Sequence, residues 1–293
     1  MKPLETTVAI VTGASRGAGR GIAVELGAAG ATVYCTGRST REAPADTYGK
    51  LLAQGHLAAM PGSIDETAEA VTAAGGRGVA VRCDATSDSD VRDLIARVER
   101  DHGKLDVLVN NAWGGHETLT GDTLDRPFWD QPLEHWESMF DRGVRNHVVA
   151  CRAAAPLFVR QQRGLIVATT YWDRGKYIKG NLFYDLAKAA ICRLAFSVAE
   201  ELCAHHVTSL AVSPGWMRTE LILAAFGTDE ARWQQVPPLA RTESPRYVGR
   251  AVAALAADAN VFAKTGGVYQ VGDLAKEYQF ADIDGRWIPP FEL

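Results

Sequence analysis

The 293-residue sequence lacks several features that would assign it to a special class of protein. No apolar run approaches the roughly 20 residues of a membrane-spanning helix. It has no basic cluster, and 31 Lys and Arg against 35 Asp and Glu give a net charge of −4, so nothing points to nucleic acid or an anionic membrane. The N-terminus carries Glu5 and runs directly into an apolar strand pattern, unlike a signal peptide. These absences favour a soluble, cytoplasmic protein.

Paired cysteines are absent as well. The five cysteines form no C-x-x-C motif and their number is odd; they are Cys35, Cys83, Cys151, Cys192 and Cys203. Scattered cysteines of this kind are typical of reduced thiols inside a cytoplasmic protein. We therefore expect neither a disulfide framework nor a metal site.

What the sequence does contain is a regular alternation of short apolar runs and longer helical patterns. The runs predict strands in a parallel sheet that is covered on both faces: Val8–Thr12, Thr32–Thr36, Val79–Arg82, Leu105–Asn110, Leu165–Thr170, Val207–Ser213 and Gly267–Val271. Between them, apolar residues recur at helical spacing, as in Val91, Leu94, Ile95 and Val98. With no linker and no internal repeat, residues 1–293 are predicted to form a single α/β domain, a doubly wound Rossmann-type fold with about seven parallel strands.

Two segments exceed what such a fold needs. Residues 41–76 form an extended connection, and residues 273–293 form a turn-rich, aromatic C-terminal tail. The tail either covers the active site or a neighbouring subunit, or both segments are ordinary surface structure.

A glycine-rich turn follows the first predicted strand and precedes a helix predicted from Arg20 to Ala29. It reads Thr12-Gly13-Ala14-Ser15-Arg16-Gly17-Ala18-Gly19. Glycines here allow a tight turn and let the backbone approach a pyrophosphate at the helix N-terminus. A second strand about 20 residues further on is typical of a dinucleotide-binding site.

The end of that second strand bears on the choice of cofactor. An acidic residue there would hold the ribose 2′-hydroxyl of NAD, but the sequence reads Thr36-Gly37-Arg38. Arg38, together with Arg16, is suited to clamp a 2′-phosphate through charge-assisted hydrogen bonds. The alternative is that both arginines are solvated surface residues. We expect NADP(H) to be preferred over NAD(H).

A tyrosine–lysine pair supplies the candidate chemistry. Tyr184 is the only one of the eight tyrosines with a lysine, Lys188, four positions later. On a helix this spacing puts both side chains on one face, where an ammonium can lower the pKa of a phenol. Together with the glycine-rich turn, the pair indicates a nicotinamide-dependent oxidoreductase.

These features, with Asn110-Asn111-Ala112 and Ser213-Pro214-Gly215, resemble the short-chain dehydrogenase/reductase family in its classical type, over roughly residues 6 to 275. The segments Gly175–Asn181 and Asp282–Arg286 resemble a bacterial branch near the family's dehydrogenase/reductase member 1. The resemblance implies a homodimer or homotetramer formed through Met139–Val159 and Lys188–Ala204, although these helices could equally be buried within one subunit.

The resemblance also implies roles for individual residues. Asp84 would contact the adenine, Thr219 would hold the nicotinamide carboxamide, and the segment Met217–Phe226 would form a mobile lid. The implied cofactor-binding residues are Gly13, Ser15, Arg16, Gly17, Ala18, Gly19, Arg38, Asp84, Ala85, Asn110, Ala112, Tyr184, Lys188, Pro214, Gly215 and Thr219. Tyr184 would donate the proton in catalysis and Lys188 would support it.

The sequence departs from the family pattern in three places. A catalytic serine usually lies about 13 residues before the tyrosine; Thr170, at 14 residues, is the candidate for its role, with Thr169 and Tyr171 as alternatives. The family's helix asparagine aligns with Gly143, and Asn146 lies one turn away. The glycine that follows Asn-Asn-Ala in the family is replaced by Trp113.

Aromatic residues at the predicted strand ends suggest an apolar substrate pocket formed by Trp113, Trp172, Tyr177 and Trp216. His116, Glu117 and His147 are expected to be solvated. The predicted function is NADPH-dependent reduction of a small or medium apolar ketone or aldehyde. The alternatives are reduction of an imine or enone, oxidation of a secondary alcohol, or an NADP(H)-binding sensor that has lost turnover.

Overall fold

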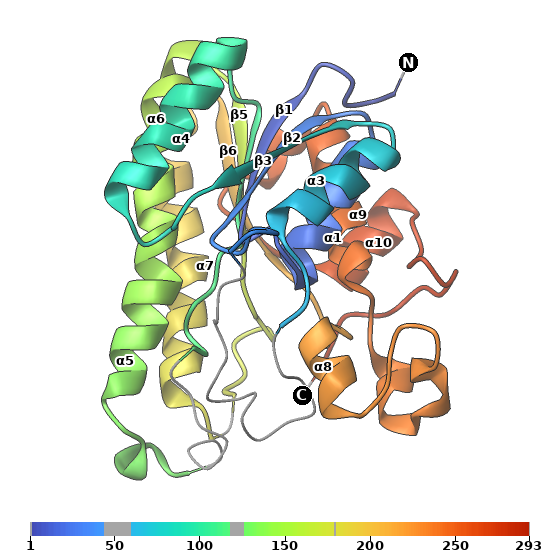
Figure 1. Ribbon diagram of the computed structural model, residues 1–293. Coiled ribbons are helices and arrows are strands. Elements are labelled where there is room, and N and C mark those ends of the chain that lie inside the picture. Colours follow the sequence, from blue (N-terminus) through green and yellow to red (C-terminus); the bar gives the residue numbers. More distant parts are fainter. Residues whose placement is uncertain (1, 44–59, 118–125, 179, 293) are drawn as a thin grey trace.

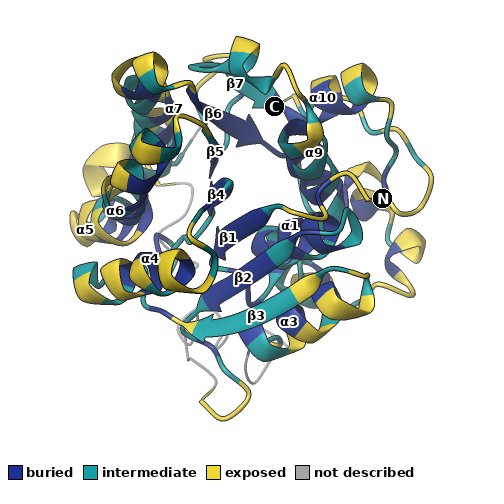
Figure 2. Cartoon of the chain, turned by 90° about the horizontal axis from the view of Figure 1, so that it is seen from above, coloured by how far each residue is buried: buried dark blue, intermediate teal, exposed yellow. Residues whose placement is uncertain are grey.

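The computed structural model describes residues 2–43, 60–117, 126–178 and 180–292. Its centre is an all-parallel sheet (Figure 1) of seven strands in the order β3-β2-β1-β4-β5-β6-β7, which can be followed in Figure 2. The strands are β1 (Val8–Thr12), β2 (Thr32–Gly37), β3 (Arg77–Arg82), β4 (Val107–Asn110), β5 (Gly164–Thr169), β6 (Val207–Ser213) and β7 (Val268–Gln270). Each predicted strand boundary lies within about two residues of the observed one. The predicted Rossmann-type class is confirmed.

Helices cover both faces of this sheet, as Figure 2 shows. One face carries α1 (Gly17–Ala28), α3 (Ile64–Ala73), α9 (Pro245–Ala257) and α10 (Val271–Tyr278). The other carries α4 (Asp88–His102), α5 (Glu134–Met139), α6 (Arg145–Gln161) and α7 (Leu182–Leu202). Strands β1, β4 and β6 are buried along their whole length, which explains why their sequences are nearly all apolar.

The connection 41–76 is not irregular throughout, because its second half forms α3. Ser63 caps this helix: its hydroxyl accepts from the Glu66 amide, and the Glu66 carboxylate accepts from the Ser63 amide. This reciprocal pair satisfies two donors that a helix start leaves open. Residues 44–59, which include most of the remaining connection, lie outside the described residues.

The C-terminal segment begins with α10 and then returns to the sheet's carboxyl edge. Asp282 is fully buried, where it accepts hydrogen bonds from Arg218 (3.3 Å) and from the amide of Ser244 (2.7 Å). Arg218 also pairs with Asp284 at 3.3 Å. The tail is therefore tied to the segment after β6 by buried charges and is not loose surface structure.

The remaining helical segments are short. They are η2 (Phe128–Asp130), the π-helical η3 (Phe140–Val144), η4 (Cys203–His205), α8 (Glu220–Ala225), η5 (Trp233–Gln235), η6 (Pro237–Arg241) and η7 (Val261–Lys264). η3 joins α5 to α6 and contains Gly143, and α8 lies within the predicted lid segment. Both sit beside the sheet's carboxyl edge and contribute to the site described below.

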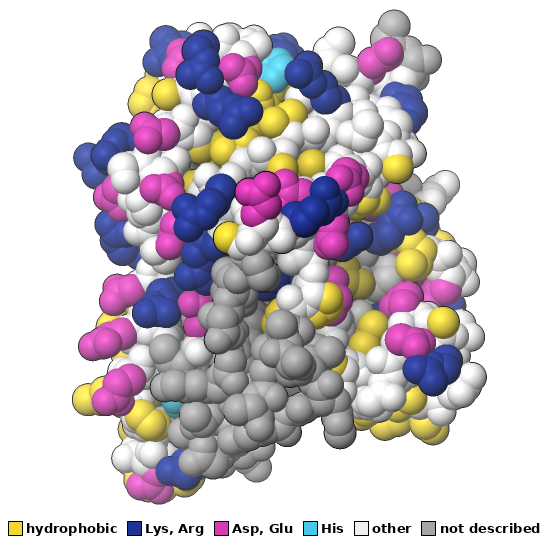
Figure 3. All heavy atoms as spheres, viewed as in Figure 1, with side chains coloured by type: hydrophobic (Ala, Val, Ile, Leu, Met, Phe, Trp, Pro, Cys, Tyr) yellow, Lys and Arg dark blue, Asp and Glu magenta, His cyan; other side chains and the backbone are white. Residues whose placement is uncertain are grey.

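All five cysteines are free, as predicted. Within the described residues, no helix is long and apolar enough to cross a membrane. Across those same segments, no group of three or more His, Cys, Asp or Glu side chains is placed to hold a metal ion. Basic and acidic side chains are interspersed over the described part of the face in Figure 3, in keeping with the net charge of −4.

Candidate active site

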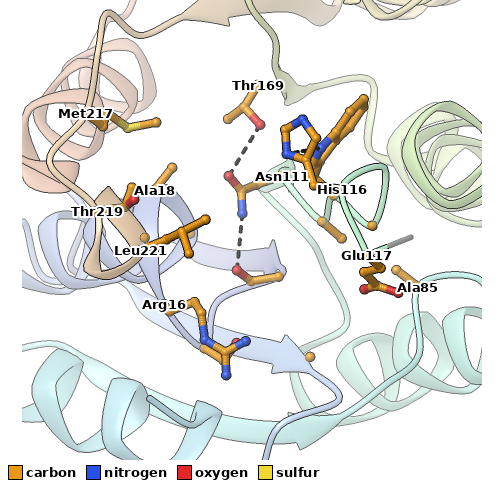
Figure 4. Close-up of a pocket in the computed structure, with 18 of the residues that line it drawn as sticks. Arg16, Ala18, Ala85, Asn111, His116, Glu117, Thr169, Met217, Thr219 and Leu221 are labelled. Atoms are coloured by element: carbon orange, nitrogen blue, oxygen red, sulfur yellow. Dashed lines mark hydrogen bonds between the residues drawn. The ribbon is translucent and has the colours of Figure 1, made fainter. Parts of the chain in front are cut away.

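The turn between β1 and α1 forms a cradle of bare backbone. Gly13 has φ +66°, and a Cβ there would lie 2.8 Å from Cα of Ala112. A Cβ on Gly19 would lie 2.2 Å from the carbonyl oxygen of Gly13, so neither position admits a side chain. The side-chain amide of Asn111 holds the turn by donating to the carbonyl of Thr12 at 3.0 Å and to that of Gly13 at 3.2 Å; Figure 4 shows the bond to Gly13. A diphosphate could approach this backbone closely.

The first amide of α1 already holds an anion. The amide nitrogen of Gly17 donates to the carboxylate of Glu220, at 3.0 Å to Oε2 and 3.3 Å to Oε1. Glu220 is the first residue of α8, and its carboxylate lies at the positive end of the α1 dipole, where an anion such as a phosphate is favoured. The residues present therefore fit a pyrophosphate, and in this structure a carboxylate from the segment after β6 lies on the same amide.

Two arginines flank the far end of the cradle. Arg16 donates to Oγ of Ser39 (3.1 Å) and to the carbonyls of Pro61 (2.9 Å) and Gly62 (3.1 Å). Arg38 forms an ion pair with Glu117. Glu117 also contacts Arg142, at 3.1 Å. Both predicted arginines thus line the cavity, and each is partly buried and bound to other residues.

Asp84 and Ala85 lie beside this end of the cavity. The Asp84 carboxylate accepts from the amide (2.9 Å) and hydroxyl (2.8 Å) of Thr86, which fixes its orientation. Asn110 lies behind the cavity wall, where it is buried and donates to Sγ of Cys151 at 3.1 Å. It is thus placed to support the strand end and not to touch a ligand.

The cradle opens into a cavity of about 580 Å³, whose inner wall holds Tyr184 and Lys188 from α7. The Lys188 ammonium lies 3.4 Å from the centre of the Trp113 ring and 5.3 Å from that of Tyr184. Burial lowers the pKa of Lys188 to about 7 and raises the pKa of Tyr184 above its ordinary value of 10. Burial, and next the neighbouring Tyr171, raise the pKa of the Tyr184 phenol, which is opposite to the direction expected from Lys188.

The three residues considered for the serine's role all line the cavity, with different partners. Thr169 donates to Oδ1 of Asn111 at 3.3 Å (Figure 4). Thr170 donates to the backbone carbonyl of Lys188 at 3.0 Å. The hydroxyl of Tyr171 is buried without a hydrogen bond to any described residue. Burial raises the pKa of Tyr171 to about 12, so this hydroxyl stays protonated.

The Trp113 side chain packs against Gly143, and this contact requires a glycine at position 143. A Cβ on Gly143 would lie 2.5 Å from Cζ3 of Trp113, so the indole fills the space that an asparagine side chain would need. Asn146 also lines the cavity, but its amide donates to the carbonyls of Ala112 (2.8 Å) and Arg142 (3.0 Å). Its Oδ1 is buried and makes no hydrogen bond to the described residues.

The expectation that His116 and His147 are solvated is wrong. Burial lowers the pKa of His116 to about 4 and that of His147 to about 3. His116 lines the cavity and stacks on Tyr184, with ring centres 5.4 Å apart and planes at 19°. The sequence signal that could have placed His116 in the site is its position in the loop after β4, three residues after Trp113. Glu117 is not free in solvent either, because it forms ion pairs with Arg38 and Arg142.

The outer wall is largely apolar. Met217, Thr219 and Leu221 line it from the segment after β6, opposite His116 and Glu117 from the loop after β4 (Figure 4). Pro214, Gly215 and Trp216, which follow β6, and Phe291 from the C-terminal tail also line this side of the cavity. Trp172 and Tyr177 do not line the cavity in the described structure. Tyr177 is exposed, and the backbone amide of Trp172 donates to Oγ of Ser213.

Comparisons with known proteins agree with this geometry. The family profile described as enoyl-(acyl carrier protein) reductase matches residues 53–271. The chain is 36% identical to dehydrogenase/reductase SDR family member 1 of Mus musculus, over 97% of this chain and 85% of that one. It is 30% identical to a 3-oxoacyl-[acyl-carrier-protein] reductase of Synechocystis, over 92% and 97% of the two chains. A short-chain dehydrogenase from Mycobacterium thermoresistibile has the same fold, with a TM-score of 0.76 at 22% identity over 98% and 92% of the chains.

Proposed function

Because the chain belongs to the short-chain dehydrogenase/reductase family and is therefore an NAD(P)(H)-dependent oxidoreductase, we propose that it reduces an apolar ketone or aldehyde with NADPH. Tyr184 is the proton donor in this proposal, with Lys188 and Thr170 as the other catalytic residues. One observation carries it: the partly buried Tyr184 and the buried Lys188 line the same cavity that the glycine cradle opens into.

The preference for NADP(H) rests on the adenosine end of the cradle. Arg16, Arg38 and the hydroxyl of Ser39 all line it, and β2 ends without a carboxylate that could hold a ribose hydroxyl. A 2′-phosphate would replace Glu117 as the partner of Arg38. Gly17, Thr219 and the other cavity-lining residues assigned above would hold the rest of the dinucleotide.

The bound cofactor supplies the hydride, and the chain's own residues handle the proton. Burial keeps the Tyr184 phenol protonated near neutral pH, as a proton donor to the carbonyl oxygen must be. Once Tyr184 has given up that proton, its negative charge favours the ammonium form of Lys188, whose pKa of about 7 allows it to respond. Thr170 would donate a second hydrogen bond after turning away from the Lys188 carbonyl.

The substrate class follows from the walls of the cavity. Trp113, Trp216, Met217, Leu221 and Phe291 present apolar surface to the cavity that holds the catalytic pair. Such walls favour a small or medium apolar carbonyl compound over a charged one.

We place the protein in the cytoplasm as a homodimer or homotetramer. Five free cysteines suit a reducing compartment. Large apolar side chains stay exposed on the two helices expected at the subunit interface: Val148 on α6, and Leu186 and Phe196 on α7. A second copy that covered these residues would remove their apolar surface from water.

The test is NADPH and NADH oxidation against a panel of ketones, aldehydes, enones and imines. Carbonyl turnover with NADPH would support the proposal, and the best substrate would define its class. Faster turnover with NADH would contradict the cofactor preference. Preferred reduction of imines or enones would replace the substrate class, and NADPH binding without turnover across the panel would favour a sensor.

A further inference from the structure

Trp113 contacts four residues of the candidate site, and the role inferred for it rests on the proposed carbonyl reduction. Its ring packs against Gly143, lies under the Lys188 ammonium at 3.4 Å and meets the Tyr184 ring edge-on at 5.7 Å. Its indole N–H donates to Nδ1 of His116 at 3.3 Å. The indole therefore holds His116 against Tyr184 in a fixed orientation.

This hydrogen bond also sets the tautomer of His116. Because Nδ1 accepts a hydrogen bond from the indole N–H, the proton of the neutral imidazole must sit on Nε2. Nε2 makes no hydrogen bond to any described residue, and His116 lines the cavity. An N–H donor is thus available beside the proton donor Tyr184.

The ring stays neutral near physiological pH. Burial, and next the charge of Lys188, lower the pKa of His116 to about 4. Tyr184 and Trp113, which pack on the imidazole, bring no formal charge, and the neighbouring Glu117 carboxylate is paired with Arg38 and Arg142. A neutral imidazole is a hydrogen-bond donor that does not compete with Tyr184 in transferring the proton.

The hydroxyls of the two threonines on this wall already donate to the protein, whereas that of Tyr171 has no hydrogen-bond partner among the described residues. The hydroxyl of Thr169 donates to Asn111, and that of Thr170 donates to the Lys188 carbonyl. We propose that Nε2–H of His116 is a further hydrogen-bond donor to the substrate's carbonyl oxygen, in addition to Tyr184 and Thr170, and that Trp113 fixes its tautomer in the space left by Gly143. The bond would strengthen as negative charge builds on that oxygen, which accelerates the reaction.

Two substitutions separate this role from packing. His116→Phe keeps a ring against Tyr184 but has no donor, whereas His116→Gln loses the ring but can place an amide N–H near Nε2. We expect kcat to fall about 10²- to 10³-fold in the Phe variant, as when one such donor is removed elsewhere, with little change in NADPH affinity. The kcat of His116→Gln should stay much closer to that of the wild type than the kcat of His116→Phe does. Equal losses in both variants, or wild-type kcat in His116→Phe, would overturn the proposal.

Trp113→Phe tests the positioning role, because it keeps an aromatic ring near Gly143 and Lys188 but removes the indole N–H. In ¹⁵N NMR spectra the wild-type His116 should show a protonated Nε2 and an unprotonated Nδ1 near neutral pH, and Trp113→Phe should show a mixture. A protonated Nδ1 in the wild type would refute the assignment. This readout needs no turnover, so it remains informative if the proposed carbonyl reduction itself fails, which the substrate panel and Tyr184→Phe would reveal.

Discussion

Removing the charge of Glu220 should tighten the binding of NADPH. In the free protein its carboxylate sits on the Gly17 amide, at 3.0 and 3.3 Å, where we expect the pyrophosphate to bind. A carboxylate at a helix N-terminus contributes about 0.3–1 kcal/mol at an accessible site, and the incoming phosphate must replace it. Glu220→Gln should therefore lower the Kd for NADPH about two- to fivefold, because 1.4 kcal/mol corresponds to a factor of ten.

Titration followed by tryptophan fluorescence, at low ionic strength, would measure this Kd. Asp229→Asn is the matched control, because Asp229 follows the same helix, is exposed and pairs with Arg232 away from the cradle. Added salt should shrink the difference between Glu220→Gln and the wild type. Weaker NADPH binding in Glu220→Gln, or a gain that Asp229→Asn matches, would refute the idea that Glu220 competes with the cofactor.

Three further predictions concern cofactor choice, packing and pH. Arg38→Gln should raise the Kd for NADPH roughly 10- to 100-fold, since hydrogen bonds to charged groups contribute about 1.5–3 kcal/mol. The Kd for NADH should change little. Equal losses of affinity for the two cofactors in parallel titrations would count against a 2′-phosphate site. Gly143→Ala should lower the free energy of unfolding by about 1–3 kcal/mol through overpacking, and Trp113→Ala should cancel that added cost, which urea unfolding of the single and double variants would show. Lys188 has a pKa of about 7 when folded and 10.5 as a free side chain, so the unfolded chain binds more protons between these values and stability should rise with pH there. Lys188→Met should flatten this rise in the free energy of unfolding, measured with urea above about pH 8. Burial raises the pKa of Glu243 to about 8, so its own titration contributes little above that pH. An unchanged slope would contradict the lowered pKa of Lys188.

The sheet could be predicted from the sequence because strands buried on both faces must be apolar along their whole length. The same locality explains why the glycine turn and the Tyr184–Lys188 pair were found, since each lies within a few residues. The predicted start of α1 at Arg20 was late by three residues: Gly17 and Gly19 are poor helix formers, but only glycine fits where α1 meets the Gly13 carbonyl.

Features that depend on contacts between distant segments were not predicted. Nothing local in Gly143 shows that it makes room for Trp113, some 30 residues earlier in the chain. The sequence left open whether the C-terminal tail covers the active site, because the place of Phe291 at the cavity depends on how the tail returns to the sheet edge. The predicted direction of the Tyr184 pKa shift was opposite to that in the structure. The shift depends on burial by several elements, which the spacing along one helix does not reveal.

The most direct test of the central claim is the rate of NADPH oxidation by wild type and Tyr184→Phe with the best carbonyl substrate, both saturated with NADPH. Tyr269→Phe is the matched control, because Tyr269 lies on β7 outside the cavity and donates to the Lys264 carbonyl. If Tyr184 donates the proton, its variant should bind NADPH normally yet lose about 10²- to 10⁴-fold in rate, while Tyr269→Phe stays near the wild type. Turnover by Tyr184→Phe at the wild-type rate would contradict the account.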